Sequence, residues 1–128
     1  MTNDKLTQDE IIKLWTDALR SGKYKQGRVK LYNTKDDTYC CLGVLCRVYE
    51  ENVGKVLPEI ERKALLNNEL EVVKDWVNLI YSDGDYGLGN SLASLNDTKC
   101  FTFNQIADII ESKPEGLFFD KLVVGKGV

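Results

Sequence analysis

The sequence predicts an α+β fold: a mainly helical single domain with a small antiparallel β-hairpin or sheet. Two segments begin with capping-box patterns and continue with apolar residues at helical spacing. A short segment between them alternates apolar and polar residues ahead of a turn, which is typical of a hairpin. The chain has 128 residues, a length at which one hydrophobic core is the usual arrangement.

The first helix is predicted over residues 8–20. Thr7 and Glu10 form a capping box, in which each side chain accepts a hydrogen bond from a backbone N–H at the start of the helix. Apolar residues then recur at helical spacing as far as Leu19, and Gly22 supplies a stop.

A hairpin and a buried helix are predicted next. Residues 27–32 alternate as a half-exposed strand does, residues 33–37 have turn composition, and residues 38–40 would return as the second strand. Residues 41–50 are apolar almost throughout, and this length favours a buried helix over a strand. We expect Gly43 to mark a close contact with another helix.

The second half is predicted to contain further helices separated by turns. Pro58 fits the first position of a helix that continues over 59–66, and a second helix is predicted over 69–80. A loop over 82–90 and a helical turn over 91–95 follow. The last helix begins at the capping box of Thr102 and Gln105 and ends at Lys113-Pro114. The adjacent Val72 and Val73 leave a strand open for the segment 69–80. Trp15 and Trp76 lie on apolar helix faces and are expected in the core.

The whole chain, residues 1–128, is predicted to be one domain with a flexible N-terminus over 1–6 and a C-terminal extension over 112–128. The extension contains apolar residues, among them 122–124, that would add an edge strand, cover the core or dock on a second subunit. No apolar run is long enough for a signal peptide or a membrane span, so we expect a cytoplasmic protein with no membrane partner.

The composition argues against a metal site and against histidine-dependent catalysis. The chain has no histidine and no Cys-x-x-Cys pair, and three of its four cysteines (Cys40, Cys41 and Cys46) lie within seven residues. Zinc ligands at workable spacing and Ser-His or Cys-His pairs are therefore lacking, and we expect no metal, no cofactor and no enzyme activity. The cysteines, including Cys100, are expected to be buried thiols.

Two motifs resemble a family. The run Trp-x-x-Ala-Leu-x-Ser-Gly-x-Tyr-x-Gln-Gly over 15–27 and the octet Tyr-Cys-Cys-Leu-Gly-Val-Leu-Cys over 39–46 resemble a small protein family common in tailed phages and prophages. Residues 92–97 and 103–110 resemble the C-terminal half of that family. The resemblance brings no catalytic residues. It implies an accessory, non-virion phage protein in the host cytoplasm, of a kind that counters host defence, in some cases by sequestering cyclic nucleotide messengers.

Positive charge is concentrated in one segment, which we call the basic island. Between Asp17 and Asp36 lie six cations and no acid, whereas the remainder of the chain has a formal net charge of −9. Cationic groups suit phosphate oxygens, and tyrosine rings can stack on a base. A solvated surface without a ligand is the alternative for the island. The predicted ligand-binding residues are Arg20, Lys23, Tyr24, Lys25, Gln26, Arg28, Lys30, Tyr32 and, for a base edge or ribose, Asn96.

The sequence leaves two main hypotheses for function. The first is a non-enzymatic phage accessory protein that binds and sequesters a small phosphorylated ligand, such as a nucleotide immune messenger. The second is a protein-interaction module that inhibits a host enzyme by direct binding; a hydrolase that uses Asp83 or Asp85 is least favoured. Long nucleic acid is not expected, because the pI is near 5.0 and the cations form one island. The identity of the ligand and any homo-oligomer stay open.

Overall fold

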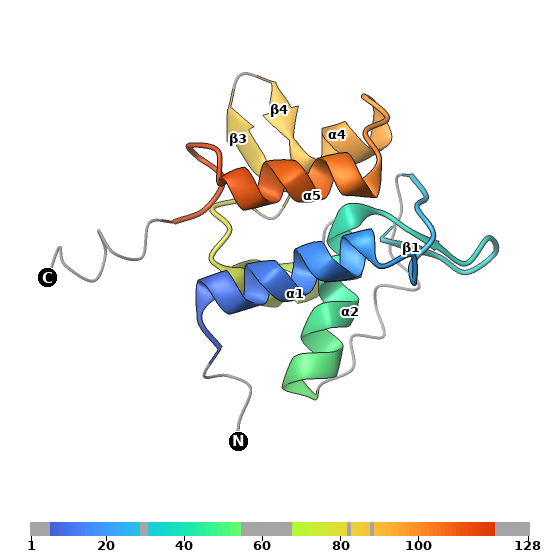
Figure 1. Cartoon of the computed structure of the whole chain (residues 1–128), viewed down its shortest axis with the longest axis horizontal. Helices are drawn as coiled ribbons and strands as arrows, with labels where there is room; N and C mark the ends of the chain where they lie inside the picture. Colours follow the sequence, from blue (N-terminus) through green and yellow to red (C-terminus); the bar gives the residue numbers. More distant parts are fainter. Residues whose placement is uncertain (1–5, 29–30, 55–67, 82, 88, 120–128) are drawn as a thin grey trace, which may run out of the picture.

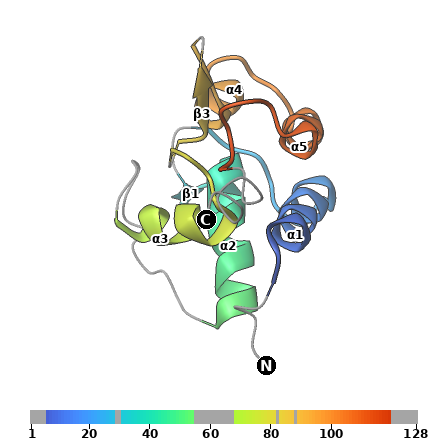
Figure 2. The same ribbon diagram turned by 90° about the vertical axis from the view of Figure 1, so that its left-hand side faces the viewer.

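The computed structural model describes residues 6–28, 31–54, 68–81, 83–87 and 89–119. Within these ranges it contains five helices and two two-stranded antiparallel sheets, which confirms the mainly helical α+β fold (Figures 1 and 2). The elements are α1 (Gln8–Arg20), β1 (Tyr32–Asn33), β2 (Thr38–Tyr39), α2 (Cys41–Val53), α3 (Asn68–Val77), β3 (Asp85–Gly87), β4 (Asn90–Ser91), α4 (Leu92–Asp97) and α5 (Phe103–Ser112).

The helices α1 and α5 begin at the predicted capping boxes. The Thr7 hydroxyl accepts a hydrogen bond from the Glu10 N–H (3.1 Å), and the Glu10 carboxylate accepts one from the Thr7 N–H (2.9 Å). Thr102 and Gln105 cap α5 in the same way. The two helices lie side by side, far apart in the sequence but packed closely together (Figure 1).

Helix α2 lies in the core, as predicted, and is three residues longer than expected. Every residue from 40 to 46 is buried, and the Trp15 indole N–H donates a hydrogen bond to the carbonyl of Cys41 (3.0 Å). A Cβ at Gly43 would lie 1.8 Å from the carbonyl oxygen of Leu31. The close contact at Gly43 is therefore with the backbone that leads into β1, and the prediction of a contact with another helix is wrong.

The first hairpin is present but shorter than predicted. Tyr32 pairs with Tyr39, and the chain turns between β1 and β2 as expected. On its other side, Tyr39 donates an N–H bond to the carbonyl of Lys25 (2.8 Å) and accepts one from the N–H of Gly27 (2.7 Å). β2 therefore has β1 along one edge and residues 25–27 along the other. The predicted strand over 27–32 is reduced to its last residue, and residues 29–30 lie outside the described ranges.

The loop predicted over 82–90 contains a second hairpin, which is a correction. Asp83 and Asp85 each accept a hydrogen bond from the backbone N–H two residues later, at 3.1 and 2.8 Å, which curls the chain into β3. β3 then pairs with β4 in an irregular antiparallel register. The predicted helical turn that follows extends to Asp97 as α4.

The helix predicted over 69–80 ends at Val77. Asn78 has a positive φ of 65°, and beyond it Leu79 forms a bridge with Phe118. The last three residues of this predicted helix, 78–80, are therefore one strand of a short ribbon. The helix predicted over 59–66 lies outside the described residues, as do the first five residues and residues 120–128.

The core contains the predicted apolar helix faces, with one correction among the cysteines. Cys40, Cys41 and Cys46 are buried, but Cys100 is exposed. It has a positive φ of 58° in the turn between α4 and α5, where the backbone faces solvent. Trp15 is fully buried, and Trp76 packs against the core with its ring edge-on to that of Tyr49.

Candidate functional site

Three tyrosines and one arginine form a surface group that we call the Tyr–Arg cluster: Tyr24, Tyr32, Tyr39 and Arg47. The Tyr39 ring meets the Tyr32 ring at 4.6 Å between centroids and the Tyr24 ring edge-on at 5.0 Å. The Arg47 guanidinium lies 5.1 Å from the Tyr32 ring and 5.5 Å from the Tyr39 ring. All four side chains are partly exposed, so the cluster presents aromatic and cationic surface together.

Secondary structure places each member of the cluster. The hairpin register puts Tyr32 opposite Tyr39, and the bridge between Gln26 and Tyr39 brings the segment that follows α1 alongside β2. Arg47 projects from α2, one and a half turns after its start, and donates an Nε–H bond to the Tyr39 hydroxyl (3.3 Å). The cluster therefore depends on three elements that are packed on one another.

Carboxylates hold the charges of the cluster in place. Arg47 forms an ion pair with Glu50 (2.8 Å), and both side chains are mostly buried. Burial lowers the pKa of Arg47, but the hydrogen bonds to Glu50 and Tyr39 outweigh that effect and leave the pKa raised. Burial raises the pKa of Tyr24, and the hydrogen bond to Asp37 raises that of Tyr32, so both phenols stay neutral at physiological pH.

Two cations of the basic island are paired with acids of other helices. Arg20 lies at the end of α1 and donates hydrogen bonds to Asp108 (2.6 Å) and to both oxygens of Glu111 (2.8 and 2.9 Å) on α5. These bonds raise the pKa of Arg20 and lower that of Glu111. Lys23 pairs with Glu51 at the end of α2 (3.1 Å), and this hydrogen bond raises the pKa of Lys23.

The other island cations are more open. Lys25, Arg28 and Lys35 are exposed, and none of the ion pairs within the described ranges includes them. Lys30, which the sequence also singled out, lies outside those ranges. The island is thus divided into cations that fasten helices together and cations that face solvent.

Gln26 and Asn96 form an internal amide network. Gln26 donates to Asn96 Oδ1 (2.9 Å) and to the carbonyl of Phe101 (2.8 Å), and its Oε1 accepts from the N–H of Phe103 (3.1 Å). Asn96 is fully buried; it donates to the carbonyl of Gly27 and to Asp97, both at 2.8 Å.

Within this network, nearly all the hydrogen-bond donors and acceptors of the Gln26 and Asn96 side chains are engaged. Asn96 Oδ1 also accepts from the N–H of Cys41 (3.3 Å), so both N–H groups and both lone pairs of this amide are engaged. Both N–H groups of Gln26 are engaged as well. These two predicted ligand-binding residues therefore join the segment after α1 to α2, α4 and α5.

Of the predicted site residues, the structure brings Tyr24 and Tyr32 together through Tyr39 and leaves Arg20 and Asn96 in other places. Sequence reasoning missed Tyr39 and Arg47 as members of a site. A signal for Arg47 is present in the sequence, because it is the one charged residue within the buried run 41–49. A charge in such a run must reach a partner or the surface.

The described residues offer little for metal binding or nucleophilic catalysis. They contain no group of three or more potential metal-ligating side chains. Burial raises the pKa of Cys40 to about 11 and that of Cys41 well above its ordinary value, so both thiols are protonated and unreactive near pH 7. The side chains of Asp83 and Asp85 serve the turn into β3. Among the described helices, none is long and apolar enough to cross a membrane.

Comparison with known proteins identifies a family without an assigned activity. The chain matches the model of a domain of unknown function (DUF8296) over residues 7–114, from the capping box of α1 to the proline that follows α5. No curated protein and no solved structure matches the chain. Because the match includes most of the sequence, the chain belongs to the DUF8296 family.

Proposed function

We propose that this protein is a non-enzymatic binding module that docks on an acidic surface of a partner protein through its Tyr–Arg cluster. The observation that carries the proposal is the packing of three partly exposed tyrosines on one another, two of them also against Arg47, with the exposed cations of the basic island close by in the sequence. Tyrosine and arginine are enriched among the residues that dominate protein interfaces, where rigid aromatic rings contribute area at low entropic cost.

A protein partner fits these residues better than a small phosphorylated ligand does. A phosphate would have to compete with Glu111 and Asp108 for Arg20, with Glu51 for Lys23 and with Glu50 for Arg47. Asn96, expected to contact a base edge or ribose, and Gln26, expected to bind ligand, are both engaged internally. A partner that contacts ring faces and the exposed cations requires none of these bonds to break.

The resemblance to phage accessory proteins gives this proposal a biological setting. In that setting the partner would be a host enzyme, and docking on its acidic surface would inhibit it. Lys25, Arg28 and Lys35 would steer the encounter, since exposed charges at the rim of an interface act mainly on the association rate. We therefore expect binding to weaken as salt concentration rises.

A pair of matched variants tests the proposal. The cluster variant combines Tyr32→Ala in the Tyr–Arg cluster with Arg28→Glu in the basic island. The control combines Tyr81→Ala with Lys99→Glu, which likewise removes one tyrosine ring and reverses one exposed positive charge, outside both regions. We expect tagged wild type and control to capture the same protein from host lysate in stoichiometric amount. The cluster variant should bind that purified protein at least about tenfold more weakly, a loss of roughly 1.4 kcal/mol.

Small phosphorylated ligands are tested in the same samples. What favours this second function is that Lys25, Arg28 and Lys35 are exposed and belong to none of the ion pairs among the described residues. Mass spectrometry of the denatured wild type would then find a stoichiometric nucleotide that the cluster variant lacks. That result, with no captured protein, would establish the small-ligand function and overturn the protein-binding one.

A further inference from the structure

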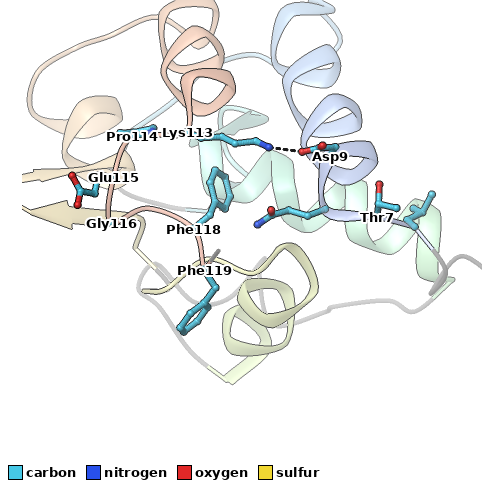
Figure 3. A pocket seen from close by; sticks show the side chains of 10 residues that line it. Thr7, Asp9, Lys113, Pro114, Glu115, Gly116, Phe118 and Phe119 are labelled. Atoms are coloured by element: carbon cyan, nitrogen blue, oxygen red, sulfur yellow. Dashed lines mark hydrogen bonds and ion pairs between the residues drawn. The ribbon is translucent and has the colours of Figure 1, made fainter. Parts of the chain in front are cut away.

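A second surface feature lies away from the Tyr–Arg cluster. A pocket of about 800 Å³ opens between the N-terminus of α1 and the segment that follows α5 (Figure 3). Its lining combines aromatic and aliphatic side chains with three charged ones, and none of it comes from the basic island. The lining residues are Leu6, Thr7, Gln8, Asp9, Lys113, Pro114, Glu115, Gly116, Phe118 and Phe119.

One wall of the pocket carries an unpaired strand edge. Residues 117–119 run antiparallel to residues 78–80, through hydrogen bonds from the Ile80 N–H to the Leu117 carbonyl (3.0 Å) and from the Phe119 N–H to the Asn78 carbonyl (2.8 Å). Between these bonds, Phe118 forms a non-hydrogen-bonded pair with Leu79, so its own N–H and C=O point away from that strand. Within the described ranges the Phe118 backbone makes no hydrogen bond.

The side chains around this edge define what would bind there. Phe118 and Phe119 point to opposite sides of the segment, so the edge is flanked by aromatic surface (Figure 3). Lys113 is paired with Asp9 across the pocket, whereas Glu115 is exposed and forms no ion pair within the described part of the chain. A complementary ligand is an extended apolar segment with a basic side chain next to it, added as a further strand.

We infer that residues 121–124 of a second copy of this chain occupy the pocket. Their sequence, Lys-Leu-Val-Val, combines strand-forming aliphatic residues with a basic side chain whose charge is complementary to that of Glu115. The segment lies outside the described residues. Only Asp120 separates it from Phe119, which lines the pocket. Two copies related by a twofold axis can therefore each supply a segment and a pocket.

The turn chemistry favours a second copy over the same copy. To pair with its own edge, the chain would have to reverse directly after Phe119, with Asp120-Lys121 as a two-residue hairpin loop. Such loops need residues that accept positive φ, above all Asn-Gly or Asp-Gly, and a lysine in the second position is unfavourable. Exchange between copies avoids this turn.

Sedimentation of the full-length chain tests the inference. The test variant is Val123→Pro, because proline has no N–H to donate to a strand ladder and blocks pairing at this residue. Lys126→Pro is the control, since it places the same residue outside the docking segment. We expect wild type and control to form a concentration-dependent dimer, and Val123→Pro to raise the dimer dissociation constant by roughly tenfold or more.

A peptide experiment identifies the occupant. A synthetic peptide of residues 120–128 is added to the full-length Val123→Pro protein and should shift the backbone amide resonances of Leu6, Gln8 and Phe118. The additional substitution Phe119→Asp in the full-length protein should abolish those shifts. A wild type that stays monomeric at all concentrations would overturn docking between copies, whether or not the peptide binds. A dimer that Val123→Pro leaves intact would overturn it as well. Neither result bears on the Tyr–Arg cluster.

Discussion

The amide network and the Tyr–Arg cluster both include residues of the segment between α1 and β1, and the sequence predicted a ligand-binding role for members of both. In the network, Gln26 and Asn96 use nearly all their donors and acceptors within the protein. In the cluster, the tyrosine rings and the Arg47 guanidinium keep part of their surface exposed. Both regions contain polar side chains, but the amides are engaged within the protein, whereas the tyrosine rings are partly exposed.

This difference shows what distinguishes a structural polar group from a binding one. A buried amide whose donors and acceptors are engaged has nothing left to offer, and removing it leaves several partners unsatisfied. A half-exposed tyrosine ring keeps one face open to solvent, and removing it costs the fold little; Arg47 differs, because it is mostly buried and paired with Glu50. Substitutions in the network should therefore act on stability, and substitutions of the tyrosines in the cluster should act on binding.

The largest expected effect is that of Asn96→Ala. This substitution leaves the N–H of Cys41, one N–H of Gln26 and the carbonyl of Gly27 without their partner, all of them in or near the core. We expect a loss of about 2–4 kcal/mol in the free energy of unfolding, measured by denaturant titration. Asn104→Ala, on the exposed face of α5, is the matched control and should have little effect. Equal stabilities of the two variants would contradict a structural role for Asn96.

A smaller effect is expected for Arg20→Gln, which removes the ion pairs between α1 and α5. These pairs are partly solvated, so the loss should be about 1 kcal/mol or less. Lys13→Gln, which breaks an exposed pair within α1, should cost less.

The same variant should change the pH dependence of stability. Arg20 lowers the pKa of Glu111 below its ordinary value of 4.5. Ionised Glu111 therefore stabilises the fold above about pH 4.5, and this contribution disappears as pH falls through the lower folded-state value. Thermal unfolding between pH 6 and pH 3 should show a shallower acid-side decline for Arg20→Gln than for wild type. Parallel curves would argue against the ion pair.

Tyr32→Phe should have a smaller effect again on the fold. It deletes the hydrogen bond to Asp37 (2.9 Å) but keeps the ring contacts with Tyr39 and Arg47. We expect a small decrease in the melting temperature and retained partner binding, whereas Tyr32→Ala should weaken binding clearly. Calorimetric titration of the partner protein with both variants measures this, and equal affinities would show that the ring is not a contact.

The smallest effect on stability is expected for the double substitution Lys25→Glu and Arg28→Glu. Both side chains are exposed and outside the ion pairs of the described residues, so the melting temperature should match that of wild type. Association with an acidic partner should nevertheless become slower, most clearly at low salt, as stopped-flow mixing would measure. Unchanged association rates would remove these cations from the interface.

The parts of the fold that sequence predicts well are those specified by neighbouring residues. The capping boxes of α1 and α5 and the apolar run of α2 are local signals, and each marks a helix in the structure. The β3–β4 hairpin was missed because its two strands are very short and lie within a glycine-rich, aspartate-rich segment. The end of α3 was misplaced because Leu79 pairs with Phe118, nearly forty residues later.

The candidate site was only partly predictable for the same reason. The charge and aromatic content of residues 20–35 pointed to a surface of interest, and Tyr24 and Tyr32 belong to the cluster. Sequence could not reveal that Arg20 reaches α5 or that Asn96 meets Gln26, because both contacts join segments at least seventy residues apart. Tyr39 and Arg47 were missed because the residues around them in the sequence are mostly apolar and predict a buried helix.

The contact between Gly43 and Leu31 has a consequence for how this family can diverge. No side chain, not even a methyl group, fits at position 43 while the Leu31 carbonyl stays where it is. A relative that varies this glycine must also reshape the approach to the first hairpin, and with it the surface that Tyr32 and Tyr39 present. Substitution of a glycine in the buried helix α2 is thereby coupled to a change in the exposed surface of the hairpin, through the contact between Gly43 and the Leu31 carbonyl.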